Sequence, residues 1–222
     1  MKKVLKSLVV FTSVLTMGAC SADSKEKTTT STKSSEKTEV SSGASEQTYT
    51  NPAEMKDSYD IIIVGAGGAG MTAAIEAKDA GLNPVIFEKM PVAGGNTLKS
   101  SSGMNASATK FQQADGINDC NEAFYEETLK GGGGTNDQEL LHYFVDHSAA
   151  AIDWLDQNGI KLDNLTITGG MSEKRTHRPS DGSAIGGYLV DGLLKNVHGR
   201  KIPIFVNTDV TDIKENSGKV NE

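Results

Sequence analysis

A short β-branched run that meets a glycine cluster limits the folds open to this chain more than any other feature. Residues 61–64 read Ile-Ile-Ile-Val, and residues 65–70 read Gly-Ala-Gly-Gly-Ala-Gly. These consecutive β-branched residues predict a short buried strand at residues 59–64, of the kind found in the centre of a parallel sheet. Residues 71–80 have a helix-forming composition, and Gly81 stands where a glycine commonly ends a helix. The order of strand, glycine turn and helix predicts a dinucleotide-binding turn in an α/β fold.

The glycines of this Gly-x-Gly-x-x-Gly pattern have separate tasks. Gly65 permits the tight turn, Gly67 lets a pyrophosphate approach the backbone, and Gly70 lets the helix pack closely on the strand. The N-terminus of the helix adds free N–H groups and a partial positive charge. A second strand at Pro84–Phe87 leads to Glu88, where a carboxylate accepts hydrogen bonds from an adenosine ribose. Because this charge would repel a 2′-phosphate, NADP is disfavoured.

A second glycine pair, Gly94 and Gly95, distinguishes between dinucleotide cofactors. In NAD-dependent dehydrogenases the chain usually enters another helix after the acidic residue. Here residues 89–97 contain proline and glycine and have no helical period, so a loop is expected. Residues 100–106 are also small and loop-like. A long loop of small residues beside a dinucleotide site fits a larger cofactor lying against extended backbone, so the sequence predicts FAD.

Later segments extend the predicted parallel α/β set. Apolar side chains at three- and four-residue steps predict amphipathic helices at residues 136–158 and 183–199. A third strand is expected at residues 202–206, because β-strand and helix alternate along the chain. Residues 210–214 are expected to form a further strand, and residues 216–219 a hairpin turn.

The N-terminal segment predicts export. Residues 1–20 contain three lysines, then an apolar core, then small residues ending in Cys20. The apolar core is shorter than the roughly 20 residues that a membrane span requires, which indicates a secretory signal. Residues 17–20 resemble the bacterial lipobox, which implies a lipid on Cys20 and an extracytoplasmic protein anchored to the cell membrane. The alternative is ordinary secretory cleavage with Cys20 unmodified.

Composition divides the remainder into two parts. Residues 21–55 are mostly Ser, Thr, Lys and Glu and are expected to form a disordered tether. Residues 56–222 then form the FAD-binding domain. The formal net charge of −7 argues against nucleic acid as a partner. If Cys20 carries a lipid, Cys120 has no internal disulfide partner, and we expect it to act as a small apolar side chain.

Five spaced motifs together resemble the flavoprotein of soluble fumarate reductases, a family that includes flavocytochrome c fumarate reductase and urocanate reductase. The resemblance covers roughly residues 59–222. Its motifs are VGAGGAG from residue 64, EKMPVAGGNT from residue 88, SSSGMNAS from residue 100, LKGGGGTND from residue 129 and RTHRP from residue 175.

The resemblance also implies which residues hold FAD. With the glycines of the two turns, the expected cofactor site comprises Gly65, Gly67, Ala69, Gly70, Glu88, Gly95, Asn96, Thr97, Ser101, Ser102, Gly103 and Val210. Val210 would touch the adenine through its backbone. No metal ligand is expected in this chain. No catalytic residue is expected either, because the arginine that donates the proton in the family lies later in the sequence. For His177 and Arg178 the interpretations left open are lining of the substrate site, a catalytic role, and neither of these.

The activity that the resemblance implies is reduction of the C=C bond of an unsaturated carboxylate, such as fumarate or urocanate, outside the cytoplasm. The electron donor would be a quinol, a flavoprotein or an exported carrier. Two alternatives stay open: a non-catalytic flavin-binding lipoprotein, and an FAD oxidoreductase of the aspartate-oxidase or ketosteroid-dehydrogenase type. Because the family's capping domain and C-terminal FAD segment have no counterpart in these 222 residues, we expect an N-terminal part of a longer reductase that is inactive alone.

Overall fold

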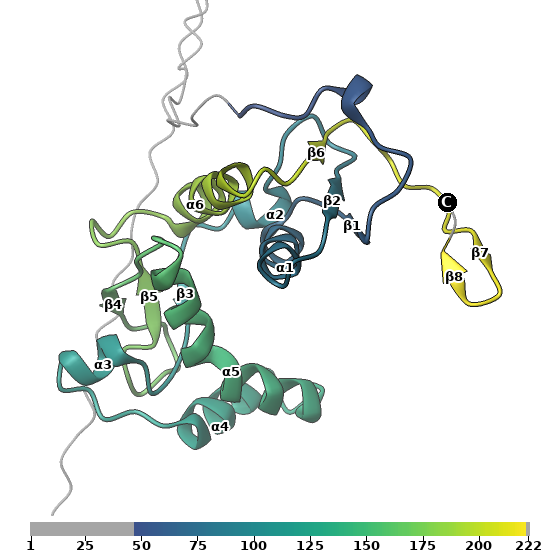
Figure 1. The fold of residues 1–222 in the computed structure, drawn as a ribbon. Helices are drawn as coiled ribbons and strands as arrows, with labels where there is room; N and C mark the ends of the chain where they lie inside the picture. The colour runs from purple at the N-terminus through teal and green to yellow at the C-terminus, as the bar shows by residue number, and fades with distance from the viewer. Residues whose placement is uncertain (1–46, 221–222) are drawn as a thin grey trace, which may run out of the picture. The chain divides into compact units, whose positions relative to one another are not determined.

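The computed structural model describes residues 47–220 of the chain. The expected signal segment, Cys20 and most of the expected tether lie outside the described residues. Figure 1 shows the elements of the described part. In chain order they are η1 (Pro52–Glu54), β1 (Ile61–Val64), α1 (Gly68–Asp79), β2 (Pro84–Phe87), α2 (Gly95–Leu98), β3 (Met104–Asn105), α3 (Lys110–Ala114), α4 (Asn121–Gly131), α5 (Gln138–Gln157), β4 (Asn164–Thr166), β5 (Thr176–Arg178), α6 (Ile185–Gly199), β6 (Ile204–Phe205), β7 (Glu215–Asn216) and β8 (Lys219–Val220).

A parallel sheet with strand order β1-β2-β6 forms the first layer, which confirms the predicted α/β fold class. The central strand is β2, because both β1 and β6 pair with it. The strand predicted at residues 59–64 is observed as β1, but the predicted full burial of that strand is not found within the described residues. Within the described residues β1 lies at an edge, and its outward side chains Ile62 and Val64 are 45% and 57% exposed.

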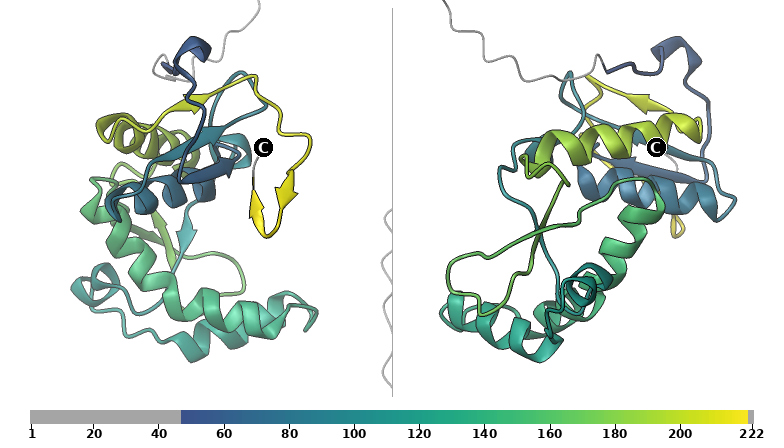
Figure 2. Two further views of the ribbon diagram at one scale, coloured as in Figure 1. Left: turned by 45° about the vertical axis from the view of Figure 1, so that its right-hand side comes forward. Right: turned by 90° about the vertical axis from the view of Figure 1, so that its left-hand side faces the viewer.

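Helices α1 and α6 pack against each other, and α1 also packs on β1 and β2 (Figure 2). Their apolar faces fill one core with the inward side chains of the sheet. Met71 and Ile75 come from α1, and Val190, Leu193 and Val197 come from α6; all five are buried. Burial of such side chains removes about 1.5–3 kcal/mol of unfavourable hydration each. This core fixes the position of the N-terminus of α1 relative to the ends of the strands.

A second, antiparallel sheet with order β3-β5-β4 was not predicted. Its strands have two or three residues, too few to show a period of two in the sequence. The helix predicted at residues 136–158 is confirmed as α5, and the side chain of Asp137 caps it by accepting a hydrogen bond from the N–H of Leu140 at 3.0 Å. The short helices α2 and α3 and the helix α4 were not predicted, and α2 occupies the end of an expected loop.

A buried ion cluster ties β5 to the chain before α4. Arg175 and Asp119 are 0% and 1% exposed at their side chains, and the carboxylate accepts two hydrogen bonds from the guanidinium, at 2.6 and 2.8 Å. Glu127 of α4 accepts another from Arg175. The hydrogen bond from the Ser172 segment to Glu127, and the one from Arg175, lower the pKa of the Glu127 carboxyl. Cys120 lies beside this cluster with its side chain exposed, so the expected apolar role is wrong.

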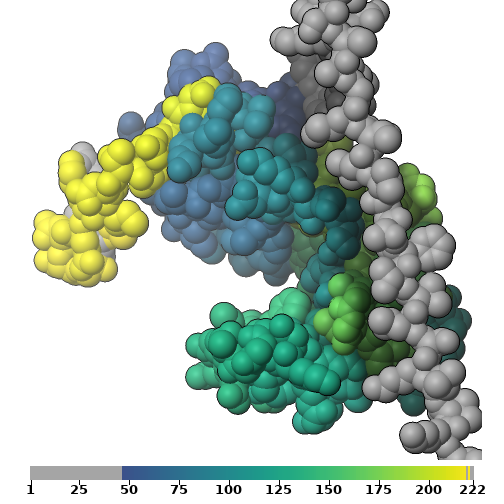
Figure 3. Space-filling view, turned by 180° about the vertical axis from the view of Figure 1, so that it is seen from behind, coloured from purple at the N-terminus to yellow at the C-terminus, as the bar shows by residue number. Residues whose placement is uncertain are grey.

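The C-terminal residues differ in part from expectation. Residues 210–214 form no strand, because no neighbouring strand pairs with them in the part of the chain that the structure describes. The hairpin that follows is confirmed, with β7 and β8 antiparallel. Ser217 and Gly218 have φ of 54° and 78°, the positive pair that a type I′ turn requires. Figure 3 shows this hairpin projecting from the surface.

The N-terminal residues of the described part contact the parallel sheet. The N–H of Thr50 donates to the carbonyl of Ile204 at 3.0 Å, and the Thr50 hydroxyl oxygen accepts from the N–H of Ile204 at 3.0 Å. The residues expected to form a tether thus include several that make defined contacts. Within residues 47–220, no helix has the length and apolar character needed to cross a membrane.

Candidate functional site

The glycine turn after β1 brings α1 into direct contact with the strand end. Gly65 has a φ of 102°, which side chains rarely allow, and its N–H donates to the carbonyl of Phe87 at 2.8 Å. A Cβ on Gly70 would overlap the carbonyl oxygen of Gly65. Only glycine permits this approach. The first N–H groups of α1 have no acceptor within the helix, so they face the turn as potential donors to an anion.

Glu88 is a buried carboxylate that braces this turn from β2. It is 7% exposed. One oxygen, Oε2, accepts from the N–H of Ala66 at 2.7 Å, and Oε1 accepts from the N–H of Met90 at 2.8 Å. Since each carboxylate oxygen has two lone pairs, both oxygens can still accept a hydrogen bond from a ligand hydroxyl.

The second glycine pair packs directly on the first glycine cluster. The N–H of Gly94 donates to the carbonyl of Ala66 at 2.8 Å, and Gly94 forms a parallel bridge with Gly67. A Cβ on Gly94 would lie 2.9 Å from Cβ of Leu98 and 3.1 Å from the methyl groups of Val190, so there is no room for a larger residue. The two glycine clusters therefore form one backbone surface.

A cavity of about 740 Å³ opens beside this surface. It lies at the carboxyl ends of β1 and β2, the edge where open α/β sheets bind ligands. Its walls are Val64, Gly65, Phe87, Glu88, Lys89, Met90, Val92, Gly95, Asn96, Leu98, Lys99, Thr208, Asp209 and Val210. Bare backbone, a buried carboxylate, apolar walls and two lysines match the adenosine and diphosphate parts of a dinucleotide.

A family model described as FAD binding domain matches residues 60–222. The chain belongs to this family. Its cofactor is FAD, and the predicted likeness to fumarate reductase flavoproteins is confirmed by its relatives.

Two relatives and one solved structure show the likeness. The chain is 54% identical over 156 residues to NADH:fumarate oxidoreductase of Klebsiella pneumoniae (strain 342), covering 70% of this chain and 17% of that protein. It is 39% identical over 165 residues to fumarate reductase (cytochrome) of Shewanella frigidimarina, covering 74% of this chain and 29% of that protein. The open conformation of a flavocytochrome c3 fumarate reductase superimposes with a TM-score of 0.69 at 38% identity, over 74% of this chain and 29% of that one. The chain thus spans less than a third of each.

Five of the twelve expected FAD residues line the cavity of the FAD-binding domain: Gly65, Glu88, Gly95, Asn96 and Val210. Others lie beside it. Gly67 caps the start of α1, Gly70 packs closely on Gly65, and the Thr97 hydroxyl oxygen in α2 accepts from the N–H of Gly68 at 3.1 Å. Thr97 therefore occupies one donor at the start of α1, and Ala69 is exposed in the same helical turn.

Ser101, Ser102 and Gly103 lie outside this cavity. The carbonyl of Ser102 accepts from the N–H of Ile185 at 3.2 Å, so the serine pair is fixed to the start of α6. A Cβ on Gly103 would overlap the carbonyl oxygen of His177, which shows that this glycine permits close packing on β5. Both serine side chains are exposed. The contact of these residues with flavin stays a prediction, because none of the three lines the cavity beside the glycine turns.

His177 is a core residue, not a lining residue. Its side chain is fully buried, with Nδ1 2.7 Å from the carbonyl oxygen of Arg175 and Nε2 2.8 Å from the hydroxyl of Thr109. Burial lowers the pKa of its imidazole. Full burial and these two contacts give His177 a structural role, not the expected lining role. Arg178 is half-buried, and its Nε has no hydrogen-bond partner in the structure.

Sequence reasoning missed two lysines at the cavity. Lys89 and Lys99 both line it, one directly after Glu88 and one after the Gly94–Gly95 loop. Two lysines in the cavity wall offer positive charge for a diphosphate. The signal that could have found them is their position in the two loops that the glycines mark.

We expect Glu88→Arg to weaken FAD binding about 10- to 100-fold, the range for losing a hydrogen bond to a charged group. The change removes the carboxylate that is predicted to accept from the ribose and places a donor against the N–H groups of Ala66 and Met90. The measurement is the dissociation constant of FAD by flavin fluorescence. The matched control is Glu88→Gln, which keeps one oxygen acceptor and should lose less. Equal affinity of Glu88→Arg and the unchanged protein would contradict the role of Glu88.

Proposed function

We propose that this chain is the adenosine- and diphosphate-binding part of an FAD-dependent reductase that acts on the C=C bond of an unsaturated carboxylate. The observation that carries the proposal is the cavity at the carboxyl ends of β1 and β2, walled by the two glycine loops and Glu88. The relatives, fumarate reductases at 54% and 39% identity, supply the reaction class.

In this proposal the chain binds and orients the cofactor. Glu88 accepts the ribose hydroxyls, and the N-terminus of α1 with Lys89 and Lys99 meets the diphosphate. FAD supplies hydride chemistry when bound. The proposed FAD residues are Gly65, Gly67, Ala69, Gly70, Glu88, Gly95, Asn96, Thr97, Ser101, Ser102, Gly103 and Val210.

The setting of the reaction is also proposed. Residues 1–20 act as a lipoprotein signal with Cys20 as the lipid-bearing residue, residues 21–55 as a tether, and residues 56–222 as the FAD-binding domain. The protein then works outside the cytoplasm, held to the cell membrane. Its electron donor is a quinol, a flavoprotein or an exported carrier, and the names of the relatives add NADH and a cytochrome as donor types.

The test uses protein produced from the native reading frame. We expect the released cofactor to show the absorption spectrum and mass of FAD, and the holoprotein to oxidise reduced viologen when fumarate, urocanate or another enoate is added. Release of a nicotinamide, or of no cofactor, would overturn the FAD site. Bound FAD without turnover of any enoate would favour the non-catalytic alternative, and turnover of aspartate or a ketosteroid would favour the other oxidoreductase type.

A further inference from the structure

Residues 47–50 lie before the segment that the family model matches, yet Tyr49 contacts Ala93, which precedes the Gly94–Gly95 loop. We infer that Tyr49 is a positioning residue for FAD: it holds the backbone of Ala93 and thereby the Gly94–Gly95 loop. The inference rests on the proposed FAD site. It assigns to this N-terminal arm, residues 47–50, a part in cofactor binding beyond that of the matched domain.

The contact between the arm and the loop is a short hydrogen-bond chain. The N–H of Ala93 donates to the Tyr49 phenol oxygen at 2.7 Å and approaches Oε1 of Gln47 at 3.2 Å. The Tyr49 hydroxyl in turn donates to Oε1 of Gln47. Ala93 is fully buried, so no water replaces these acceptors if they are lost. Burial raises the pKa of the Tyr49 hydroxyl, as does the nearby charge of Glu88, which keeps the donor proton in place.

The loop that Ala93 begins is part of the cavity wall. The next residue, Gly94, donates to the carbonyl of Ala66 at 2.8 Å and bridges Gly67. Gly95 follows and lines the cavity. A displacement of Ala93 therefore moves the backbone on which the dinucleotide lies, within two residues of the cavity.

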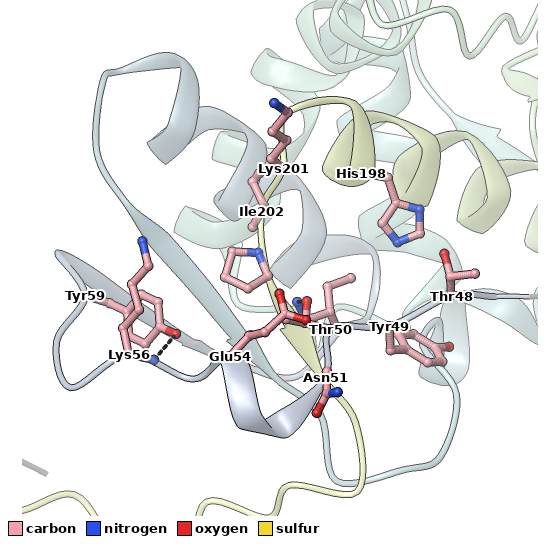
Figure 4. Close-up of a pocket in the computed structure, with 12 residues that line it drawn as sticks. Thr48, Tyr49, Thr50, Asn51, Glu54, Lys56, Tyr59, His198, Lys201 and Ile202 are labelled. Carbon is pink, nitrogen blue, oxygen red and sulfur yellow. Dashed lines mark hydrogen bonds between the residues drawn. The ribbon is translucent and has the colours of Figure 1, made fainter.

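The arm itself is fixed, so it can act as a support. The two hydrogen bonds between Thr50 and Ile204 attach it to β6, and the ring of Tyr49 packs against the main core. Between this arm and β6 lies a hollow of about 570 Å³ (Figure 4). The N-terminal arm thus connects β6, the outer strand of the sheet, to the Gly94–Gly95 loop.

The same region supplies a matched control. The phenol oxygen of Tyr59 accepts one backbone N–H, that of Lys56, at 2.9 Å. Figure 4 shows this bond at the opposite end of the hollow from Tyr49. Tyr59→Phe and Tyr49→Phe each remove one phenol oxygen that accepts a backbone N–H, but only Tyr49 contacts the loop.

The experiment compares the two variants in protein from the native reading frame. Tyr49→Phe is expected to raise the dissociation constant of FAD about three- to tenfold, the range for one hydrogen bond. It should also speed amide hydrogen exchange in the peptide spanning residues 90–98 of the cofactor-free protein. Tyr59→Phe should change neither quantity. A purely structural role would lower the melting temperature in both variants without this local difference.

Equal FAD affinity in Tyr49→Phe and the unchanged protein, or equal losses in both variants, would overturn the inference. If Tyr49→Phe does not fold, Gln47→Leu removes the second acceptor of Ala93 and should give the same pattern. Failure of the unchanged protein to bind FAD would overturn the proposed function instead. The exchange rate of residues 90–98 would then still test the support of the loop by Tyr49.

Discussion

Asp119→Ala is expected to lower the free energy of unfolding by about 3–5 kcal/mol, because it breaks a buried ion pair and leaves a charge behind. The Arg175 guanidinium is 0% exposed and, among the described residues, would keep only Glu127 as an ionised partner. Asp119 also accepts from the Gln112 amide at 2.8 Å, so Gln112 loses one of its two acceptors and keeps the carbonyl of Lys174. The change in unfolding free energy is measured by urea denaturation, with circular dichroism as the signal for unfolding.

The control for this prediction is an exposed ion pair of the same chemistry. Asp79 binds Arg200 at 2.7 Å with side chains 50% and 26% exposed. Exposed pairs contribute about 0–1 kcal/mol, so Asp79→Ala should shift the urea midpoint little. Similar shifts for Asp119→Ala and Asp79→Ala would show that the buried cluster adds no more stability than a surface pair.

Gly70→Ala is expected to abolish FAD retention on gel filtration and to lower the melting temperature. The added Cβ would overlap the Gly65 carbonyl and lie 3.3 Å from Cγ2 of Ile63, so α1 must move away from β1. Overpacking of this kind costs about 1–3 kcal/mol. Because the proposed diphosphate site lies at the N-terminus of α1, the same movement is expected to remove donors from the cofactor.

Gly187→Ala is the matched control for Gly70→Ala. Gly187 also lies in a helix, α6, but an added Cβ there has no neighbour within 4 Å. Alanine in an open helical position is favoured over glycine by about 0.5–1 kcal/mol, so this variant should be slightly more stable and keep its FAD. Retention of FAD by Gly70→Ala at the level of Gly187→Ala would contradict the close-packing argument.

The sequence predicted the segments whose structure depends on local pattern. The strand at residues 84–87 was predicted with its observed bounds, and β1 was predicted as a strand, because short β-branched runs are bounded by glycine or a charged residue. The hairpin after residue 214 was predicted because Ser217 and Gly218 carry a turn signal of their own. In these places neighbouring residues determine the backbone.

The elements that depend on distant pairing were missed. Met104 pairs with His177, and no local pattern records a partner so far along the chain. The edge position of β1 depends on which strands join the sheet, and local pattern does not record that order. At the site, the sequence identified Glu88, but not that its carboxylate also accepts two backbone N–H groups. The contact of Tyr49 with Ala93 was missed for the same reason.

The pairing of Thr50 with Ile204 sets the order in which the chain can fold. The two residues are 154 positions apart, and β6 pairs with β2 through Ile204 and Ile86. The ribosome must therefore reach residue 204 before the outer strand can join the sheet, and loop closure of this length makes folding slow. During that interval Pro84–Phe87 is an apolar strand whose edge toward β6 is open. Chaperone binding during synthesis is expected to concentrate on this segment.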